Sequence, residues 1–148
     1  MTSSFGRLLL MLFVTVFGGV AVAQAQIASD TRIQADIPFN FTVGDATLSA
    51  GKYEVRRIED LAQNILEIRS VDGRASVIFD ASPAQTKDTR PSDQSELVFD
   101  KYGDRYFLSQ IWVEGTSTGN ELLKSRMEKK VAIAFNEPGK QSVAAVVK

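Results

Sequence analysis

The stretch SELVFDKYGDRYFLSQIWVE, residues Ser95–Glu114, decides the fold of this chain. It contains the only Trp and the densest group of aromatic residues in the sequence. Gly103 and Asp104 separate its two apolar-rich runs, and a two-residue loop with Gly first suits a type II′ turn because glycine tolerates a positive φ. The stretch predicts a β-hairpin with Tyr102 opposite Arg105, Phe99 opposite Leu108 and Leu97 opposite Gln110.

Both faces of this predicted hairpin are apolar. Strict alternation places Leu97, Phe99, Tyr106, Leu108 and Trp112 on one face and Val98, Tyr102, Phe107, Ile111 and Val113 on the other. A hairpin wetted on one side would alternate more cleanly between apolar and polar residues. We therefore expect the hairpin to be central and covered on both sides, and we interpret its aromatic residues as core packing rather than a ligand-stacking platform.

The N-terminus has the layout of a cleaved secretory signal peptide. Arg7 is the only charged side chain before Asp30, and it precedes an apolar run at residues 8–23. Small-residue patterns follow, with cleavage expected after Ala23 or Ala25. The alternative is an uncleaved anchor, but a run of 16 residues is shorter than the ~20 that usually span a bilayer. We expect export to the periplasm or the exterior.

Residues 1–25 are thus predicted to be a signal peptide, and residues 26–148 a single β-rich domain. No second apolar segment has membrane-spanning length, so no transmembrane segment is expected after cleavage. Without Arg7, 16 basic residues remain against 18 acidic ones, a net charge of −2. A near-neutral surface predicts no nucleic-acid partner, because such binding needs a basic patch. The absence of Cys excludes disulfides, so the core must supply the stability.

The first half of the domain reads as a succession of short strands after a flexible lead at residues 26–31. The predicted strands cover residues 32–43, 47–48, 52–58, 64–70 and 74–80. Pro38 lies inside the first run, and since proline cannot donate to a ladder it predicts an edge, a bulge or a break into two strands. Asp72-Gly73 is a strong hairpin signal between the last two strands.

A helix is predicted over about residues 120–134, with Asn120 as its N-cap. Its apolar stripe consists of Leu123, Met127, Val131, Ala134 and Phe135. An alternative is a helix that ends near Lys130, followed by a strand over residues 131–135. The tail at residues 137–148 is either disordered or a last edge strand.

The segment at residues 82–94, SPAQTKDTRPSDQ, has two prolines and no large apolar side chain. A loop of this length is either functional or mobile, and we interpret it as mobile. Short strands followed by one helix predict a mainly β fold: an antiparallel β-barrel or β-sandwich of about six to eight strands with one C-terminal α-helix.

The chain has no His and no Cys. This composition excludes Ser-His-Asp and Cys-His nucleophilic sites, thiolate or imidazole zinc sites and cysteine-bound iron-sulfur clusters. Neither a phosphate-binding P-loop nor a dinucleotide-binding glycine motif is present. We therefore expect no enzyme activity, no cofactor and no metal.

Two sets of charged residues could have a function, one acidic and one basic. Carboxylates on predicted strands, which a two-carboxylate glycan hydrolase would need, are Glu54, Glu67, Asp80 and Asp100. A basic run that could contact anionic lipid comprises Lys124, Arg126, Lys129 and Lys130, interrupted by Glu121 and Glu128. We interpret both groups as ordinary, the acids as solvent-facing strand positions and the cations as complements of the helix dipole. Asp104 is likewise interpreted as a turn residue rather than a calcium ligand.

Four segments resemble an uncharacterised family of small secreted β-rich proteins common in acidobacterial genomes. They are PFNFTVG at residues 38–44, GKYEV at residues 51–55, YGDRYFL at residues 102–108 and GNELLKSR at residues 119–126. The resemblance spans most of the predicted domain. It implies a shared fold and export, and it transfers no activity.

These observations predict an exported, non-enzymatic β-domain that binds an envelope ligand or protein partner or acts structurally. The alternatives are a carboxylate-dependent glycan hydrolase and a peripheral membrane-surface protein. The candidate ligand-binding residues lie around the tip of the central hairpin: Tyr102, Asp104, Arg105 and Tyr106.

Overall fold

The computed structural model describes residues 31–58, 61, 64–85, 93–135 and 137–148, so the predicted signal peptide lies outside the described residues. The described part contains ten strands and one helix. In chain order they are β1 (Arg32–Ile37), β2 (Phe41–Val43), β3 (Ala46–Leu48), β4 (Gly51–Arg57), β5 (Ile65–Ser70), β6 (Ser76–Gln85), β7 (Ser95–Tyr102), β8 (Arg105–Trp112), β9 (Thr118–Leu122), α1 (Arg126–Ala132) and β10 (Gly139–Val147).

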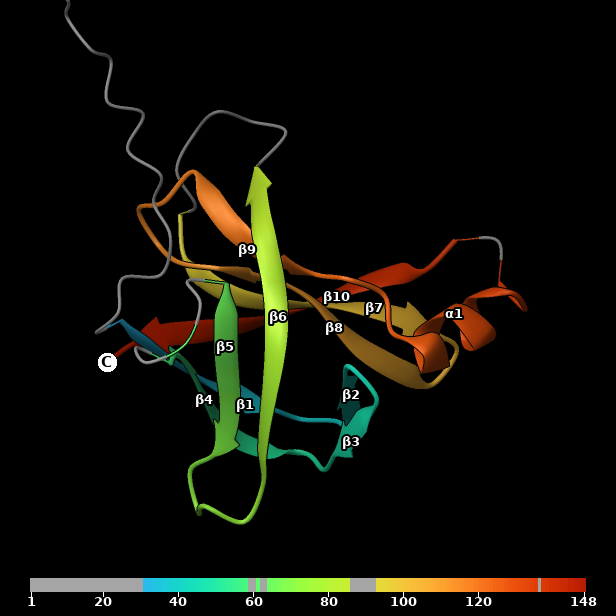
Figure 1. The fold of residues 1–148 in the computed structure, drawn as a ribbon, viewed down its shortest axis with the longest axis horizontal. Helices are drawn as coiled ribbons and strands as arrows, with labels where there is room; N and C mark the ends of the chain where they lie inside the picture. The colour runs from blue at the N-terminus through green and yellow to red at the C-terminus, as the bar shows by residue number, and fades with distance from the viewer. Residues whose placement is uncertain (1–30, 59–60, 62–63, 86–92, 136) are drawn as a thin grey trace, which may run out of the picture.

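Eight strands close into an antiparallel barrel in the order β1, β4, β5, β6, β9, β8, β7 and β10, with β10 returning to β1 (Figure 1). The pairing of β8 with β9 completes the ring. The β2–β3 hairpin attaches to β8 through the parallel pairing of Thr42 with Phe107. The fold is therefore mainly β, as predicted, and it is a barrel rather than a sandwich. Closure removes the edges that an open sheet would expose.

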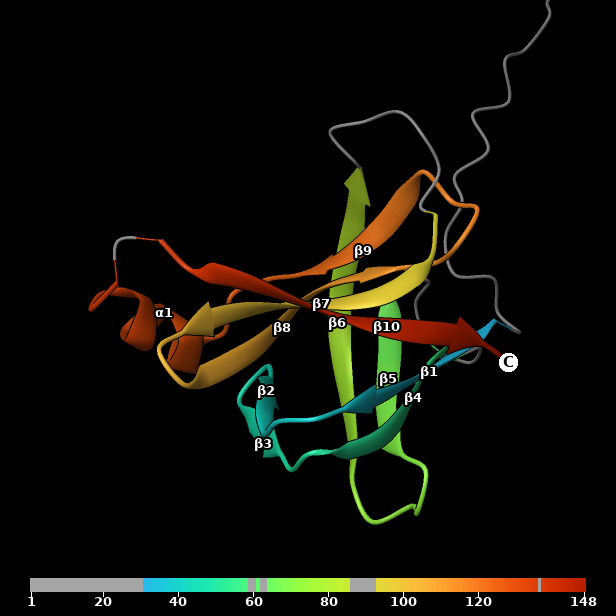
Figure 2. The same ribbon diagram turned by 180° about the vertical axis from the view of Figure 1, so that it is seen from behind.

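The C-terminal tail was expected to be disordered or a last edge strand, and it is a strand, although not at an edge. Residues Gly139–Val147 form β10, which pairs with β7 on one side and β1 on the other. Val143 and Ala145 alternate toward the core and pack against it. The tail therefore belongs to the barrel wall (Figure 2).

The barrel interior is filled by side chains. Seven of the barrel strands contribute buried apolar side chains at their inward-facing positions, and β10 contributes the partly buried Val143 and Ala145. Phe41 and Phe99 anchor this core, with ring centroids 5.5 Å apart in an edge-to-face arrangement. Such aromatic contacts add to the apolar burial that stabilises a barrel without disulfides.

The central hairpin forms β7 and β8, which lie between β10 and β9, and its predicted central position is confirmed. The predicted pairs nearest the turn are confirmed: Tyr102 with Arg105 and Phe99 with Leu108. Leu97, however, pairs with Ile111 rather than Gln110. A β-bulge leaves Ser109 without a partner in the ladder, and its hydroxyl donates to the Val98 carbonyl at 3.1 Å.

One extra residue reverses the faces of every position beyond it. Ile111 therefore joins the interior core, whereas strict alternation had placed it opposite Leu97 and Phe99. Trp112 correspondingly leaves the interior and packs with Val98 and Ala84 on the outside of the barrel. The apolar residues on both hairpin faces thus serve two clusters, one inside and one outside.

The N-terminal strands follow the prediction closely. Pro38 breaks the first apolar run, so that β1 ends at Ile37 and β2 begins at Phe41. The Asp72-Gly73 turn joins β5 to β6, and Gly73 has a φ of 74°, which only glycine adopts readily.

The predicted loop at residues 82–94 is partly wrong. Strand β6 continues to Gln85 because its second half pairs with β9. The Ala81 N–H bonds to the Asn64 carbonyl, on the β5 side of β6. Residues two apart in a strand direct their backbone nitrogens to the same side, so the Pro83 nitrogen also faces away from β9, and proline is tolerated there. Its missing N–H therefore costs no bond to β9. Residues 86–92 lie outside the described residues.

The predicted helix at residues 120–134 is shorter than expected. Asn120 is buried in β9, which closes the barrel, and the helix begins only after Ser125. Ser125 is the N-cap, and its hydroxyl accepts a hydrogen bond from the Glu128 N–H at 3.1 Å. The alternative strand over residues 131–135 is also wrong, since α1 runs to Ala132. Figures 1 and 2 place α1 outside the barrel, beside the β7–β8 turn.

Candidate functional site

Three of the four predicted ligand-binding residues line one cleft. Tyr102, Asp104 and Arg105 border a space of about 480 Å³ between the hairpin tip and α1. Tyr106 does not line it, because its ring stacks on Phe39 with centroids 3.9 Å apart and planes inclined by 17°. The hairpin tip as a ligand site stays a prediction, carried mainly by its two exposed residues, Asp104 and Arg105.

Tyr102 has a structural role at this position. Its side chain is 1% exposed, and its hydroxyl donates to Glu128 Oε1 at 3.1 Å. The hydroxyl oxygen of Tyr102 also accepts a hydrogen bond from Lys124 Nζ at 2.7 Å. The phenol therefore joins β7 to α1 and to the segment before it. Its hydroxyl is engaged as both donor and acceptor in these two hydrogen bonds rather than directed at the cleft.

A buried charge cluster surrounds this phenol on the outer face of the barrel. Asp100 lies two residues before Tyr102 on β7 and is 3% exposed. Lys140, its cross-strand neighbour on β10, binds one carboxylate oxygen, and Lys124 Nζ lies 3.3 Å from the other. Glu128 of α1 is 4% exposed and lies 3.6 Å from Lys124 Nζ. The cluster thus holds α1 against the barrel wall.

The pKa values of the two carboxyls in this cluster, Asp100 and Glu128, are shifted in opposite directions. Burial alone would raise the pKa of Asp100, but the hydrogen bond and charge of Lys140 lower it below its ordinary value. Burial, together with the negative charge of Asp100, raises the pKa of Glu128. The charged form of Asp100 is thus favoured, and its negative charge disfavours the charged form of Glu128. Lys124 has a raised pKa, first through its hydrogen bond with Tyr102, and remains a cation.

Carboxyls with divergent pKa values can mark an acid–base pair. Asp100 and Glu128, however, are buried under α1, share hydrogen-bonding groups and line neither cleft that the structure describes. The other strand carboxylates also have structural partners: Glu54 with Arg32, Glu67 with Arg56 and Ser76, and Asp80 with Asn64. Neither carboxyl of this pair therefore lines a described cleft in which a glycan could bind.

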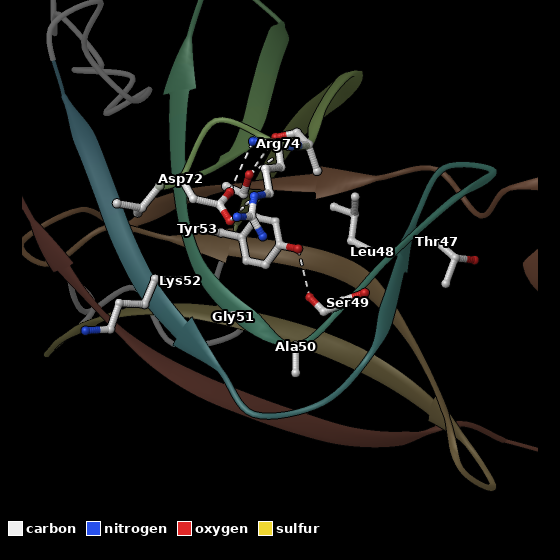
Figure 3. Close-up of a pocket in the computed structure, with 12 residues that line it drawn as sticks. Thr47, Leu48, Ser49, Ala50, Gly51, Lys52, Tyr53, Asp72 and Arg74 are labelled. Atoms are coloured by element: carbon white, nitrogen blue, oxygen red, sulfur yellow. Dashed lines mark hydrogen bonds and ion pairs between the residues drawn. The ribbon is translucent and has the colours of Figure 1, made fainter.

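A larger cleft of about 660 Å³ lies at one end of the barrel (Figure 3). It is bounded by two segments far apart in the sequence, the β3–β4 turn and the β5–β6 hairpin. Its lining residues are Thr47, Leu48, Ser49, Ala50, Gly51, Lys52, Tyr53, Ser70, Val71, Asp72, Arg74 and Ala75. Clefts that bind small molecules usually measure about 300–1,000 Å³.

Tyr53 stands at the centre of this cleft. Its hydroxyl donates to the Ser49 carbonyl at 2.8 Å, which ties the β3–β4 turn to β4. Burial, and secondarily the Asp72 carboxylate, raises the pKa of Tyr53, so the phenol stays neutral. Figure 3 shows the Tyr53 ring between Ser49 below and the Asp72–Arg74 pair above, while Lys52 points away.

The upper rim of the cleft presents two opposite charges. Asp72 Oδ1 accepts the Arg74 N–H at 3.1 Å, and Asp72 Oδ2 lies 3.5 Å from Arg74 Nε. A hydrogen bond with Ser70 and the Arg74 N–H lower the pKa of Asp72, so it is an anion at neutral pH. The rim thus offers a carboxylate acceptor and a guanidinium with several donors.

Sequence reasoning missed this cleft. Turn signals at residues 49–51 and 72–73 were visible, but nothing in their spacing places the two turns side by side. That juxtaposition depends on the antiparallel pairing of β4 with β5, which sets Tyr53 opposite Ser70.

Among the described residues, no group of three or more acidic side chains is placed to hold a metal ion. No helix in this part of the chain is long and apolar enough to cross a membrane. No protein-family model, curated protein or solved structure matches this chain.

Proposed function

We propose that this chain is an exported, non-enzymatic binding protein whose ligand occupies the cleft between the β3–β4 turn and the β5–β6 hairpin. The observation that carries the proposal is the cleft itself: about 660 Å³ bounded by hydroxyl, backbone and charged groups. The barrel interior is filled by its core, so a ligand has its place at the barrel end rather than inside. Export rests on the signal-peptide layout of residues 1–25.

The lining of the cleft favours a polar ligand. Ser49 and Ser70 supply hydroxyls, and Asp72 and Arg74 supply opposite charges. Tyr53 is only 4% exposed and cannot offer its face as a broad stacking platform. We infer a ligand with hydroxyl, amide and charged groups, such as an amino-sugar peptide of the bacterial cell wall. We also propose, from the resemblance of the four segments between residues 38 and 126, that the chain belongs to the acidobacterial family of secreted proteins.

Muramyl dipeptide is a suitable probe because it carries all three kinds of group. Binding to the folded chain from Gln26 onward is measured by calorimetry and by thermal unfolding. A ligand at ~100 times its Kd should raise the free energy of unfolding by about 2.7 kcal/mol. Because all barrel strands lie between Arg32 and Val147, this chain contains the complete barrel.

Two matched pairs of variants locate the site. Asp72→Asn and Asp104→Asn change the same residue type in two hairpin turns, and Arg74→Gln and Arg105→Gln do so beside them. We expect only the Asp72 and Arg74 variants to weaken binding, by roughly ten-fold each for a lost charged hydrogen bond. Weakening by the Asp104 and Arg105 variants instead would move the site to the hairpin tip, and turnover of the probe would refute the non-enzymatic role.

A further inference from the structure

The solvent face of α1 carries only cations and one apolar residue. Arg126, Lys129, Lys130 and Ile133 follow the spacing i, i+3, i+4 and i+7, which places them on one side of a helix. All four are exposed, and Ile133 is 86% exposed. None of the three cations forms an ion pair with another residue that the structure describes.

The acid that interrupts this basic run in the sequence is absent from the surface. Glu128 is 4% exposed and is bound to Tyr102 and Lys124 beneath the helix. Asp45, in the turn between β2 and β3, contacts the first turn of the helix, where its carboxylate accepts a hydrogen bond from the Met127 N–H at 3.3 Å. The outward face itself therefore keeps its three positive charges.

Exposed apolar side chains accompany these charges. Leu123, two residues before the N-cap, is 81% exposed. Phe135, just after the helix, is 41% exposed, but its ring packs edge-on against Tyr102 with centroids 5.7 Å apart, so it belongs to the contact with the hairpin tip. Ile133 and Leu123 are the two most exposed large apolar side chains of the described residues. Helix-dipole complementation explains cations in the last turn. It does not explain why large apolar residues beside them face water.

We propose that this α1 surface, comprising Leu123, Arg126, Lys129, Lys130 and Ile133, docks onto an anionic lipid bilayer. The cations complement lipid phosphates, and the apolar side chains enter the boundary between headgroups and acyl chains. The apolar residues are separated along the chain by cations, a pattern that suits a fluid surface better than a shaped protein pocket. The cleft at the barrel end is formed by other segments, so membrane docking is independent of ligand binding.

The absence of native Cys allows a site-specific test. Ile133→Cys is labelled with the environment-sensitive dye NBD, and Ile78→Cys on β6, where the native side chain is 58% exposed, is the matched control. Each protein, from Gln26 onward, is mixed with phosphatidylglycerol–phosphatidylcholine vesicles and with phosphatidylcholine vesicles alone. Affinities of the unlabelled protein are measured by co-sedimentation at low and high salt.

We expect a blue shift and brightening of the dye at position 133 on anionic vesicles only, reversed by high salt, and no change at position 78. Arg126→Gln with Lys129→Gln should lower vesicle affinity by about 25-fold, at roughly five-fold for each cation. Equal binding to neutral vesicles, an unresponsive dye at position 133, or unchanged affinity of the double variant would overturn the proposal. Capture by polyglutamate without vesicle binding would also overturn it and assign the surface to an acidic protein.

Discussion

Replacing Asp100 with Asn tests whether the buried charge cluster fixes α1 to the barrel. The Asp100 side chain is 4% exposed and is bound by Lys140 and Lys124. Asn preserves the shape but removes the charge, and its NH2 group would present donors to one of the two ammonium groups, which is itself a donor. The loss should therefore exceed that of a surface ion pair.

The geometry sets the size of the effect. Breaking a buried ion pair commonly costs about 3–5 kcal/mol. Here the lysine side chains are 43% and 54% exposed and can regain water, and Glu128 remains as a partner for Lys124. We therefore expect a loss of about 2–3 kcal/mol in the free energy of unfolding at neutral pH.

Urea unfolding followed by fluorescence of the single Trp measures this loss. With a slope of ~2 kcal/mol per molar, the midpoint should fall by roughly 1–1.5 M. Asp104→Asn, in the exposed turn nearby, should change stability by less than about 0.5 kcal/mol. A loss below that value for Asp100→Asn would refute the reasoning, because it would mean that the lysine contacts contribute no net stability.

The remaining predictions concern α1 and the packing of Gly119 against Trp112. The pKa of Glu128 is raised on folding, so its contribution is complete below its ordinary value of 4.5 and is lost as pH rises through the folded pKa. Glu128→Gln cannot ionise and should gain stability relative to the native protein as pH rises from 4.5, and parallel pH profiles of urea unfolding would contradict this. A Cβ at Gly119 would lie 2.5 Å from the Trp112 ring, so Gly119→Ala should cost about 1–3 kcal/mol in thermal unfolding, and an unchanged Tm would argue against this packing. Ser125→Ala removes the N-cap and should cost about 1 kcal/mol, whereas Ser125→Asp should retain most of the stability.

The sequence was informative where local signals and tertiary pairing agree. Gly73 and Gly103 are turn glycines that local chemistry identifies, and both hairpins formed where expected. The bulge at Ser109 was not predictable from periodicity, because an extra residue leaves no mark in the composition. It nevertheless decides which of Ile111 and Trp112 enters the barrel.

The start of the helix shows how two local signals compete. Asn120 and Ser125 are both suitable N-caps, and Ser125 has a Glu three residues later, the pattern of a capping box. The sequence contained that stronger signal. Pairing of residues 118–122 with β6 and β8 then excludes a helix at Asn120, and this pairing follows from barrel closure rather than from local propensity.

The candidate site was harder to predict than the fold. The predicted ligand-binding residues surround the hairpin tip, yet Tyr102 is buried in a charge cluster and Tyr106 stacks on Phe39. The larger cleft combines turns about 20 residues apart, at Ser49 and Asp72, and only the strand order places them together.

An amide NMR titration of the ¹⁵N-labelled chain from Gln26 onward with muramyl dipeptide tests the proposed ligand site most directly. We predict that saturable shifts concentrate at residues 48–53 and 70–75, on both sides of the cleft, and are lost in Arg74→Gln. Shifts centred on residues 102–105, or no saturable shifts with this probe or with related cell-wall fragments, would contradict the assignment of the cleft as the binding site.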